Sequence, residues 1–427
     1  MLQKIIQKKL ENYVKKYFLK HPNVKLVVVT GSVEKTSTKV AIGTVLAEKF
    51  KVRLHEGNHN TFLSAPLAIL GVEYPDNIKS INAWREVFKA CKQRIRDEAD
   101  VDVIVQELGS DRIGQVKHFG KYLKPDYAVI TAVSAEHMEF FKTIDMVARE
   151  ELEVANYSKI ALINRDDIDS EFAKYLTNPN INTYGTSVEA EYHFISEGYT
   201  AGNGHKGKLI APEWLEPVDA TINVFGEHTL RPAIAGVAIG VKFGITPEEV
   251  IKGLIKVSAL PGRMNMLRGV KNSVLIDDTY NSSPLAVKSS LNELYKLPAP
   301  QKIAVLGSMN ELGLTSAEEH RELGKMCDPS QLAWVVTVGD EAEKYLAPSA
   351  KSRGCQVKVC KTAIEAGAFV NSVIEPNATI LFKGSQGNVY LEEAVKILLH
   401  NATDSEVLVR QSEKWLKIKN DFFSKFK

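Results

Sequence analysis

The sequence between Val27 and Lys39 reads VVVTGSVEKTSTK, and its two halves have different patterns. The first half ends an apolar run from residue 24 to 30, which is typical of a strand buried in a parallel sheet. The second half is polar and leads into helical periodicity. A short loop between such a strand and a helix presents backbone N–H groups, and a helix N-terminus favours anions. The segment therefore predicts a phosphate-binding loop at the edge of a sheet.

The general nucleotide-binding pattern G-x-x-x-x-G-K-[ST] fits this segment only in part. Lys35 and Thr36 stand where the pattern has the lysine that reaches the terminal phosphates and the hydroxyl that holds Mg²⁺. Val29 and Glu34 replace its two glycines. From these residues alone, an incidental strand-to-helix turn is as good an interpretation as a phosphate loop.

Apolar runs alternate with helical patterns along the whole chain, which predicts an α/β fold with two doubly wound, mostly parallel sheets. The first series comprises residues 24–30, 101–107, 127–133 and 159–164, and the second comprises 273–277, 302–306, 334–338, 357–359 and 379–382. Pro261-Gly262 lies between the two series, so we place a domain boundary and hinge near residue 260. We expect an amphipathic helix over 1–23, a central domain over 24–259, a C-terminal domain over 260–400 and a helical tail over 401–427 that docks on the body. Residues 200–207 predict a hairpin tip.

The composition is that of a globular protein, with 427 residues, 44% hydrophobic and 25% charged. Lys and Arg number 54 against 52 Asp and Glu, which leaves no basic excess for nucleic acid, and we expect no nucleic-acid partner. Four cysteines without a C-x-x-C pair favour a reducing compartment and give no support for a zinc site. Charges interrupt the apolar stretches of the N-terminus, so we expect neither a signal peptide nor a membrane span, and a cytoplasmic location. Packing of the N-terminal helix on the body is favoured over transient membrane contact.

Segments spread over the chain resemble, in the same order, the motifs of the Mur ligases. They are TGSVEKT (30–36), GNHNT (57–61), ELG (107–109), AEHME (135–139), LPGRM (260–264), DDTYNSSP (277–284), LGSMNELG (306–313) and KGS (383–385). The resemblance extends from about residue 24 to about residue 393. Within the family the chain is most similar to the MurF type, the UDP-MurNAc-tripeptide:D-alanyl-D-alanine ligases, without their usual N-terminal UDP-binding domain.

This resemblance implies a central P-loop ATPase domain, a C-terminal Rossmann-like α/β domain and an ATP- and Mg²⁺-dependent amide ligase of cell-wall peptide synthesis. Such an enzyme activates a substrate carboxylate as an acyl phosphate, which the amine of an amino acid or dipeptide then attacks. The carboxylate substrate would be a small molecule or a nucleotide-sugar peptide. Another amino-acid ligase of the superfamily, of the polyglutamate type, and a non-catalytic nucleotide-binding module remain as alternatives. The identity of both substrates and the oligomeric state stay open.

The resemblance also implies roles for individual residues. The catalytic residues would be Lys35, Glu107, His137 and Arg263. The nucleotide would contact Gly31, Ser32, Val33, Glu34, Lys35, Thr36, Ser37, His228, Arg263, Asp278 and Asn281. Thr36 and Glu107 would hold a first Mg²⁺, and His137 a second. The substrate loop would contribute Asn58, Asn60 and Thr61.

Three departures from the family motifs carry their own expectations. Glu151 stands where many Mur ligases have a carbamylated lysine, and its carboxylate offers the second metal the same hard oxygens, unless it is one of several solvated helix acids. Glu34 places a negative charge beside the phosphates, so we expect weaker ATP binding unless its side chain points outward. Thr229 and Pro232 replace the two asparagines of the adenine-side motif that follows Gly226.

Overall fold

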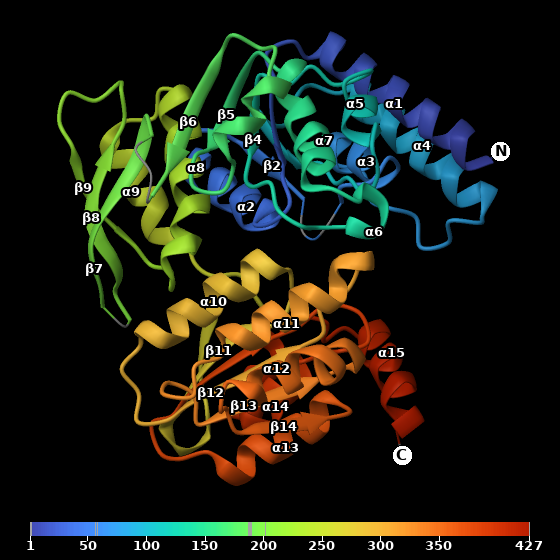
Figure 1. Cartoon of the computed structure of the whole chain (residues 1–427). Helices are drawn as coiled ribbons and strands as arrows, with labels where there is room; N and C mark the ends of the chain where they lie inside the picture. The colour runs from blue at the N-terminus through green and yellow to red at the C-terminus, as the bar shows by residue number, and fades with distance from the viewer. Residues whose placement is uncertain (1, 56, 58, 187–189, 201, 427) are drawn as a thin grey trace. The chain divides into compact units, whose positions relative to one another are not determined.

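The computed structural model in Figure 1 describes residues 2–55, 57, 59–186, 190–200 and 202–426. The contacts divide the chain into two compact units. The first unit comprises residues 1–134, 143–224 and 229–258, and the second comprises residues 135–142, 225–228 and 259–427. Each unit is built on its own sheet.

The first unit contains a nine-stranded sheet in the order β2-β3-β1-β4-β5-β6-β7-β8-β9. Strands β2 to β7 pair in parallel, whereas β7, β8 and β9 pair antiparallel. The strands are β1 (Lys25–Thr30), β2 (Val52–Leu54), β3 (Val103–Glu107), β4 (Tyr127–Ile130), β5 (Ile160–Asn164), β6 (Ile181–Gly185), β7 (Tyr192–Thr200), β8 (Gly204–Ile210) and β9 (Val218–Ile222).

Helices cover this sheet and bury its apolar strands. They are α1 (Leu2–Lys20), α2 (Lys35–Leu46), α3 (Ser64–Leu70), α4 (Ile81–Arg96), α5 (Gln115–Phe119), α7 (Ile144–Asn156), α8 (Leu230–Lys242) and α9 (Pro247–Lys256). Helices α2 and α8 approach closely, and a Cβ on Gly236 would lie 3.0 Å from the carbonyl oxygen of Ala41. The small residues of α8 therefore bring it against the helix that begins at the phosphate loop.

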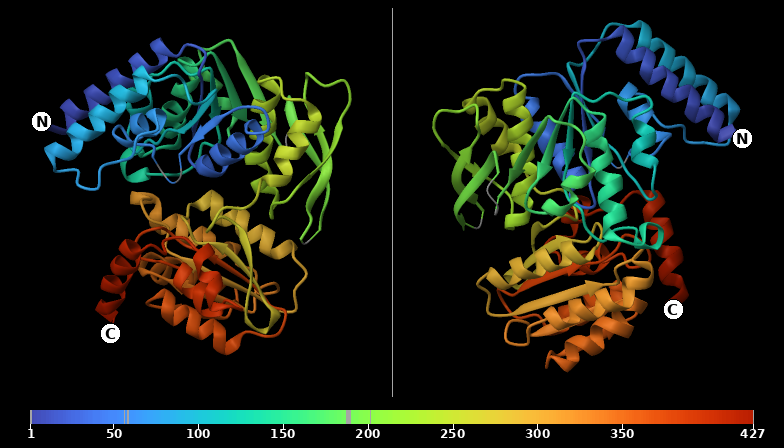
Figure 2. Two further views of the ribbon diagram at one scale, coloured as in Figure 1. Left: turned by 180° about the vertical axis from the view of Figure 1, so that it is seen from behind. Right: turned by 45° about the horizontal axis from the view of Figure 1, so that its top comes forward.

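Helix α1 packs on α3 and α4 through one face, which includes Ile6, Leu10, Tyr13, Val14 and Tyr17. All five side chains are buried, at spacings of three and four residues that place them on one side of the helix. In both views of Figure 2, α1 and α4 lie side by side. The N-terminal helix is thus anchored to the first unit.

The second unit contains a six-stranded sheet in the order β10-β11-β15-β12-β13-β14. Only β10 runs antiparallel to its neighbour, and the other strands pair in parallel. The strands are β10 (Asn265–Arg268), β11 (Val274–Asp278), β12 (Lys302–Gly307), β13 (Trp334–Val338), β14 (Val357–Cys360) and β15 (Thr379–Lys383). The helices are α6 (Met138–Phe141), α10 (Pro284–Lys296), α11 (Ser316–Met326), α12 (Ala347–Ser352), α13 (Ala363–Val373), α14 (Glu392–Leu398) and α15 (Glu413–Phe423).

The predicted α/β class with two mostly parallel sheets is confirmed. The sequence patterns did not predict the antiparallel additions, which are β10 and the meander β7–β9. The hairpin tip expected over 200–207 is shorter, because Thr200 already pairs with Gly204 across the β7–β8 turn. Across the described ranges, no helix combines the length and the apolar character needed to cross a bilayer.

The packing of α1 gives a testable prediction. Leu10 lies on the packed face of α1 and is fully buried, whereas Leu19 of the same helix is 81% exposed. We expect Leu10→Ala to lower the free energy of unfolding of the first unit by about 2–5 kcal/mol, because it leaves a cavity in a packed interface. Urea unfolding monitored by tryptophan fluorescence, with hydrogen exchange of the α1 amides, measures this. Leu19→Ala is the matched control, and an equal effect of both substitutions would show that α1 does not pack as described.

Candidate active site

Three parallel strands of the first unit end side by side, and the candidate residues follow them. In the register of the sheet, Val29 of β1 lies beside Glu107 of β3 and beside Val129 of β4. Ligands of α/β sheets bind outside the carboxyl ends of the strands. The phosphate loop, Glu107 and the segment after β4 therefore meet at the edge where a ligand is expected.

The segment after β4 holds the backbone of the phosphate loop. Gly31 has a φ of 128°, and a Cβ on it would lie 2.2 Å from Thr131 Oγ1 and 2.8 Å from the nitrogen of Ala132. Thr131 Oγ1 donates to the carbonyl of Val33 at 2.6 Å, and the Ser32 amide donates to the carbonyl of Ala132 at 3.0 Å. Only glycine fits at this position, so β4 and the loop sequence together determine the conformation.

Helix α2 begins directly at Lys35, so the loop ends at a helix N-terminus. The first N–H groups of a helix have no acceptor inside the helix, and Lys35, Thr36 and Ser37 form this first turn. Lys35 Nζ donates to the carbonyl oxygens of Gly31 and Ser32, which places its charge over the loop. This combination of a cation and a helix N-terminus suits a polyanionic ligand.

Glu107 links the phosphate loop to the predicted substrate loop. Its side chain is 2% exposed; Oε2 accepts a hydrogen bond from Thr36 Oγ1 at 2.9 Å, and Oε1 accepts one from Asn60 Nδ2 at 2.9 Å. The structure thus brings together three of the predicted residues around one buried carboxylate. Two hard oxygen donors, from Thr36 and Glu107, fit the ligand preference of Mg²⁺.

The substrate loop is anchored by two buried residues that sequence reasoning missed. Lys39 Nζ donates to the carbonyls of His55 and Gly57 at 2.8 and 2.9 Å, and Gln106 Nε2 donates to the carbonyl of His59 at 2.7 Å. The position of Lys39 one helical turn after Lys35 is the sequence signal that could have indicated it.

Two further residues, Thr61 and Asn58, were predicted to contact the substrate. Thr61 bonds locally, since its amide donates to Ser64 Oγ at 3.1 Å and its hydroxyl lies 2.8 Å from the same oxygen. Asn58 lies outside the described residues. Of the two predicted substrate contacts within the described residues, Asn60 donates a hydrogen bond to Glu107.

Glu151 reaches the base of the phosphate loop from α7. Its side chain is 2% exposed, and Oε2 accepts hydrogen bonds from the Gly31 amide at 2.8 Å and from Thr30 Oγ1. Glu151 is therefore not a solvated helix acid. Its neighbour Glu150 is also buried and accepts from the amides of Gly114 and Val116, both at 2.6 Å, so it caps α5 and lies apart from this loop.

Glu34 lies in the left-handed region with φ 63° and ψ 7°, where the general pattern has glycine. The charge of Glu34 also affects Arg231. Burial lowers the pKa of this arginine, but the carboxylates of Asp167, Glu34 and Asp166 raise it by more, so that the net effect is a raised pKa. Arg231 Nη1 lies 2.7 Å from Asp167, and Nε lies 3.1 Å from Asp166. Arg231 is thus already paired with two carboxylates, and Glu34 is a third negative charge in its surroundings. No sequence motif indicated Arg231.

His137 belongs to the second unit, where it precedes α6 with a φ of 49°. Its Nδ1 lies 2.8 Å from Glu311 and its Nε2 lies 3.5 Å from Glu136. The hydrogen bond from His137 lowers the pKa of Glu311. The predicted residues are therefore divided between the two units. The second unit carries His137, His228, Arg263, Asp278 and Asn281, and the other described candidates lie in the first.

Asp278 ends strand β11 and forms an ion pair in the second unit. Its Oδ2 lies 2.6 Å from Lys383 Nζ and accepts from Ser290 Oγ at 2.6 Å, while Oδ1 accepts from the Met264 amide at 3.3 Å. Lys383 Nζ also donates to the carbonyl of Asn281 at 3.2 Å. The buried Lys383 thus connects two predicted nucleotide contacts.

The predicted hinge is hydrogen-bonded to the loop after β11. The Gly262 amide donates to Asp277 Oδ2 at 3.0 Å, and the Tyr280 amide donates to the Gly262 carbonyl at 2.9 Å. The Arg263 guanidinium lies 4.1 Å from the centre of the Tyr280 ring, a cation–π geometry. The orientation of Arg263 is therefore coupled to the loop that carries Asp278.

The C-terminal tail supports the same loop through Arg410, which sequence reasoning missed. Arg410 Nη1 and Nη2 donate to the carbonyls of Tyr280 at 3.0 Å and Thr279 at 2.6 Å. Nε and Nη2 also bind the fully buried Glu392 at 2.8 Å each. No sequence signal indicated that Arg410 binds this loop, because its region was expected only to dock on the body.

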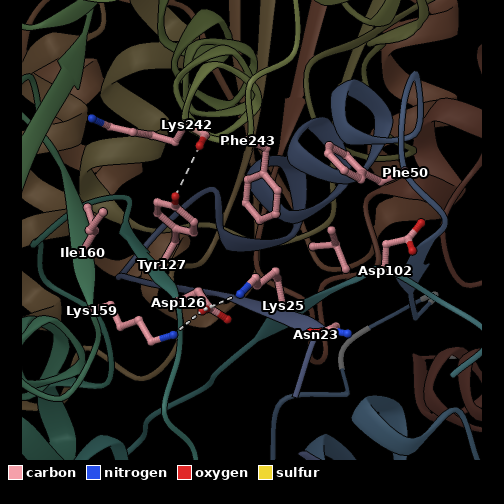
Figure 3. A pocket seen from close by; sticks show the side chains of 11 residues that line it. Asn23, Lys25, Phe50, Asp102, Asp126, Tyr127, Lys159, Ile160, Lys242 and Phe243 are labelled. Atoms are coloured by element: carbon pink, nitrogen blue, oxygen red, sulfur yellow. Dashed lines mark hydrogen bonds and ion pairs between the residues drawn. The ribbon is translucent and has the colours of Figure 1, made fainter. Parts of the chain in front are cut away.

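A pocket of about 470 Å³ lies at the opposite edge of the first sheet, where β1, β3, β4 and β5 begin (Figure 3). Phe243 forms its aromatic wall together with Phe50 and Tyr127, at ring-centre distances of 5.6 and 5.2 Å. Asp126 binds two of its lysines, Lys25 at 3.8 Å and Lys159 at 2.7 Å. Because the carboxyl ends of the strands lie at the other edge, this pocket is separate from the candidate active site.

Comparisons with known proteins agree over most of the chain. The family model of the Mur ligase middle domain matches residues 29–240, and that of the Mur ligase, glutamate ligase domain matches residues 262–386. The UDP-N-acetylmuramoyl-tripeptide--D-alanyl-D-alanine ligase of Bacillus subtilis is 27% identical over 393 residues, covering 90% of this chain and 78% of the relative. The enzyme of the same name from Rickettsia prowazekii is 28% identical over 381 residues, covering 87% and 77%.

The fold also resembles that of solved structures. The MurF ligase of Thermotoga maritima in complex with ADP superposes with a TM-score of 0.74 at 23% identity, covering 92% of this chain and 83% of that chain. A MurF structure from Acinetobacter baumannii gives a TM-score of 0.73 at 22% identity, covering 90% and 79%. At this identity the structural likeness concerns the fold.

The position of Glu151 gives a second prediction. We expect Glu151→Ala to reduce Mg-ATP turnover at least tenfold, because the Gly31 amide and the Thr30 hydroxyl lose their acceptor at the loop. Glu151→Gln keeps one acceptor oxygen and removes the charge. Retained turnover of the Gln variant at limiting Mg²⁺ would assign Glu151 to loop positioning, and lost turnover would assign it to the metal. Unchanged kinetics of Glu151→Ala at limiting Mg²⁺ would remove Glu151 from the site.

The hinge gives a third prediction, which concerns pH. Burial raises the pKa of Asp277 from 3.8 to about 6, against the lowering effect of the hydrogen bonds from Thr279 and Gly262. A carboxyl group whose pKa is higher in the folded than in the unfolded chain stabilises the fold at a pH below its unfolded pKa. This contribution is lost as the pH rises through the folded pKa of about 6. When the pH rises from 4 to 7, the free energy of unfolding of the wild type should therefore fall by on the order of 2–3 kcal/mol relative to that of Asp277→Asn. Melting temperatures of both proteins across this range test it, and parallel profiles would contradict it.

Proposed function

Because the chain belongs to the Mur ligase family, we propose that it is an ATP- and Mg²⁺-dependent ligase that joins D-alanyl-D-alanine to a UDP-linked muramoyl tripeptide. The relatives from Bacillus subtilis and Rickettsia prowazekii carry the name of this activity, and the chain spans more than three quarters of each. They favour neither the polyglutamate-type ligase nor the non-catalytic module. The proposal includes a cytoplasmic location, where ATP is available and where buried, free cysteines are stable.

The observation that carries the proposal is the buried Glu107 carboxylate between Thr36 and Asn60. A carboxylate withdrawn from water requires hydrogen-bond partners or a cation. Here one partner lies on the phosphate loop and the other on the substrate loop. The nucleotide side and the acceptor side of a ligase therefore meet at this single group.

The proposed reaction has two steps. A carboxylate oxygen of the tripeptide attacks the γ-phosphorus of ATP, ADP leaves, and the amine of the dipeptide then displaces phosphate from the acyl carbon and loses a proton. When bound, Mg²⁺ neutralises charge on the transferring phosphate. Thr36 and Glu107 are the residues that would hold it.

The residues of the first unit contribute position and charge. Lys35 supplies a cation over the loop, and the first turn of α2 supplies N–H groups for the phosphates. The amides of Gly31 and Ser32 already donate to Glu151 and Ala132, so these two amides fix the loop. Because the loop is fixed in this way, the N–H groups of the first turn of α2 need no reorganisation to stabilise charge that develops on a phosphate.

Residues of the second unit are also assigned to the nucleotide by the family resemblance. We assign the ribose to Asp278 and the γ-phosphate to Arg263, whose orientations the hinge and the β11 loop determine together. His137, paired with Glu311, is assigned to the second metal ion with its other ring nitrogen. These assignments stay predictions of the family resemblance.

The experiment that tests the proposal uses UDP-MurNAc-tripeptide, D-alanyl-D-alanine and Mg-ATP, with phosphate release and product mass as readouts. We expect Lys35→Ala and Glu107→Gln each to reduce kcat by roughly 10²–10³, because one removes charge from the transferring phosphate and the other removes a metal ligand. Lys159→Ala, on the opposite edge of the sheet, is the matched control. Wild-type ATP consumption by both variants would show that the ligase site is elsewhere.

A second arm of the experiment separates the substrate assignment from the activity class. A panel that replaces D-alanyl-D-alanine by glutamate, and the nucleotide-linked tripeptide by simpler carboxylates, is measured under the same conditions. Turnover only with glutamate would support the polyglutamate-type alternative. Absence of turnover with every pair would support the non-catalytic module.

A further inference from the structure

Helices α1 and α4 concentrate the positive charge of the chain. Together they contain eleven Lys and Arg and two Glu, a net charge of +9, whereas the whole chain has a net charge of +2. The rest of the chain is therefore negative by seven charges. Such an asymmetry in a nearly neutral protein marks a surface with its own electrostatic character.

The two helices form one continuous surface. Tyr13 of α1 packs on Phe88 of α4 with ring centres 6.1 Å apart, and Lys9 Nζ lies 4.0 Å from the centre of the same Phe88 ring. Lys9 therefore lies at the junction between the helices. Figures 1 and 2 show both helices running side by side along one flank of the first unit.

The cations occupy the outward side of both helices. On α4, Arg85, Lys89, Lys92 and Arg96 are exposed and follow the spacing i, i+4, i+7, i+11, which places them on one stripe. On α1, the exposed cations are Lys4, Lys8, Lys9, Lys15, Lys16 and Lys20. Arg94 is excluded from the set, because it is only partly exposed and binds Asp100 at 2.8 Å, whereas Lys89 is exposed and lies 4.0 Å from Glu86. We refer to the ten exposed cations as the α1/α4 basic face.

Aliphatic side chains are exposed among these cations. Ile5 is 59% exposed, Leu19 is 81% exposed and Ile81 is 60% exposed. Ile5 and Leu19 are fourteen residues apart on α1, four turns along the same outward face. Clustered lysines and arginines are attracted to the negative surface of an anionic bilayer, and exposed aliphatic side chains among them can enter its interface.

We propose that the α1/α4 basic face docks the protein on the surface of an anionic membrane, with the cations against lipid phosphates and Ile5, Leu19 and Ile81 at the acyl boundary. The charge of the face complements a lipid surface, and its aliphatic residues gain by leaving water there. A nucleic-acid partner is less well matched, because the described outward side of these helices exposes aliphatic side chains and no large aromatic ring for base stacking. The docking leaves the candidate active site unaltered, because its residues lie on other elements.

Sedimentation of the full chain with vesicles tests the proposal. We expect binding to vesicles of phosphatidylcholine with about 30% phosphatidylglycerol, weak binding to pure phosphatidylcholine, and loss of most binding at high salt, where charges are screened. The variant Arg85→Gln, Lys89→Gln, Lys92→Gln and Arg96→Gln should bind anionic vesicles on the order of a hundredfold more weakly. Leu19→Ser should weaken the part of the binding that survives in salt.

The matched control changes the same number and kind of charges in the second unit, with Arg321→Gln, Lys344→Gln, Lys351→Gln and Arg353→Gln, all of which are exposed. It should bind anionic vesicles as wild type does. Circular dichroism and melting temperature verify that every variant is folded. The proposal is overturned if the wild-type protein does not bind anionic vesicles, or if both quadruple variants lose binding equally. It is also overturned if a single-stranded RNA binds the α1/α4 basic face and vesicles do not.

Discussion

The candidate site of the first unit is organised around the buried carboxylate of Glu107. Glu107 ends an apolar strand at a point where water is excluded, and the free energy of its burial is offset only if both oxygens are bonded. Thr36 and Asn60 provide these bonds from segments on either side of β3 in the sheet. The phosphate loop and the substrate loop are consequently held at one strand end, and the geometry of a site for two reactants follows from the need to satisfy one group.

The phosphate loop of this protein has two acidic residues next to it, in different settings. Glu151 takes the place expected for a modified lysine, and its carboxylate accepts from Gly31 and Thr30 at the base of the loop. Glu34 takes the place of a glycine in the left-handed region, and its charge is one of those that raise the pKa of Arg231. A carboxylate is compatible with a polyanion site when it is either bonded to the backbone or balanced by a nearby cation.

The second unit holds its nucleotide residues by a network that extends into the C-terminal tail. Arg410 and Glu392 form a buried bidentate pair, and Arg410 also binds the carbonyls of the loop after β11. A buried pair of this kind favours one arrangement of the loop, because breaking it would leave an uncompensated charge. The C-terminal tail therefore helps to position the loop that follows Asp278.

The sequence by itself determined the α/β class, the strand-loop-helix at residues 27–39 and the order of the motifs, because these follow from local periodicity and from spacing along the chain. It could not determine that Glu151 binds Gly31, 120 residues away along the chain, or that Arg410 binds Tyr280, 130 residues away. It also missed Lys39 and Arg231, and the meander β7–β9. Only the tertiary structure decides which buried charges meet, because hydrogen bonding in a core depends on the positions of distant segments rather than on local pattern.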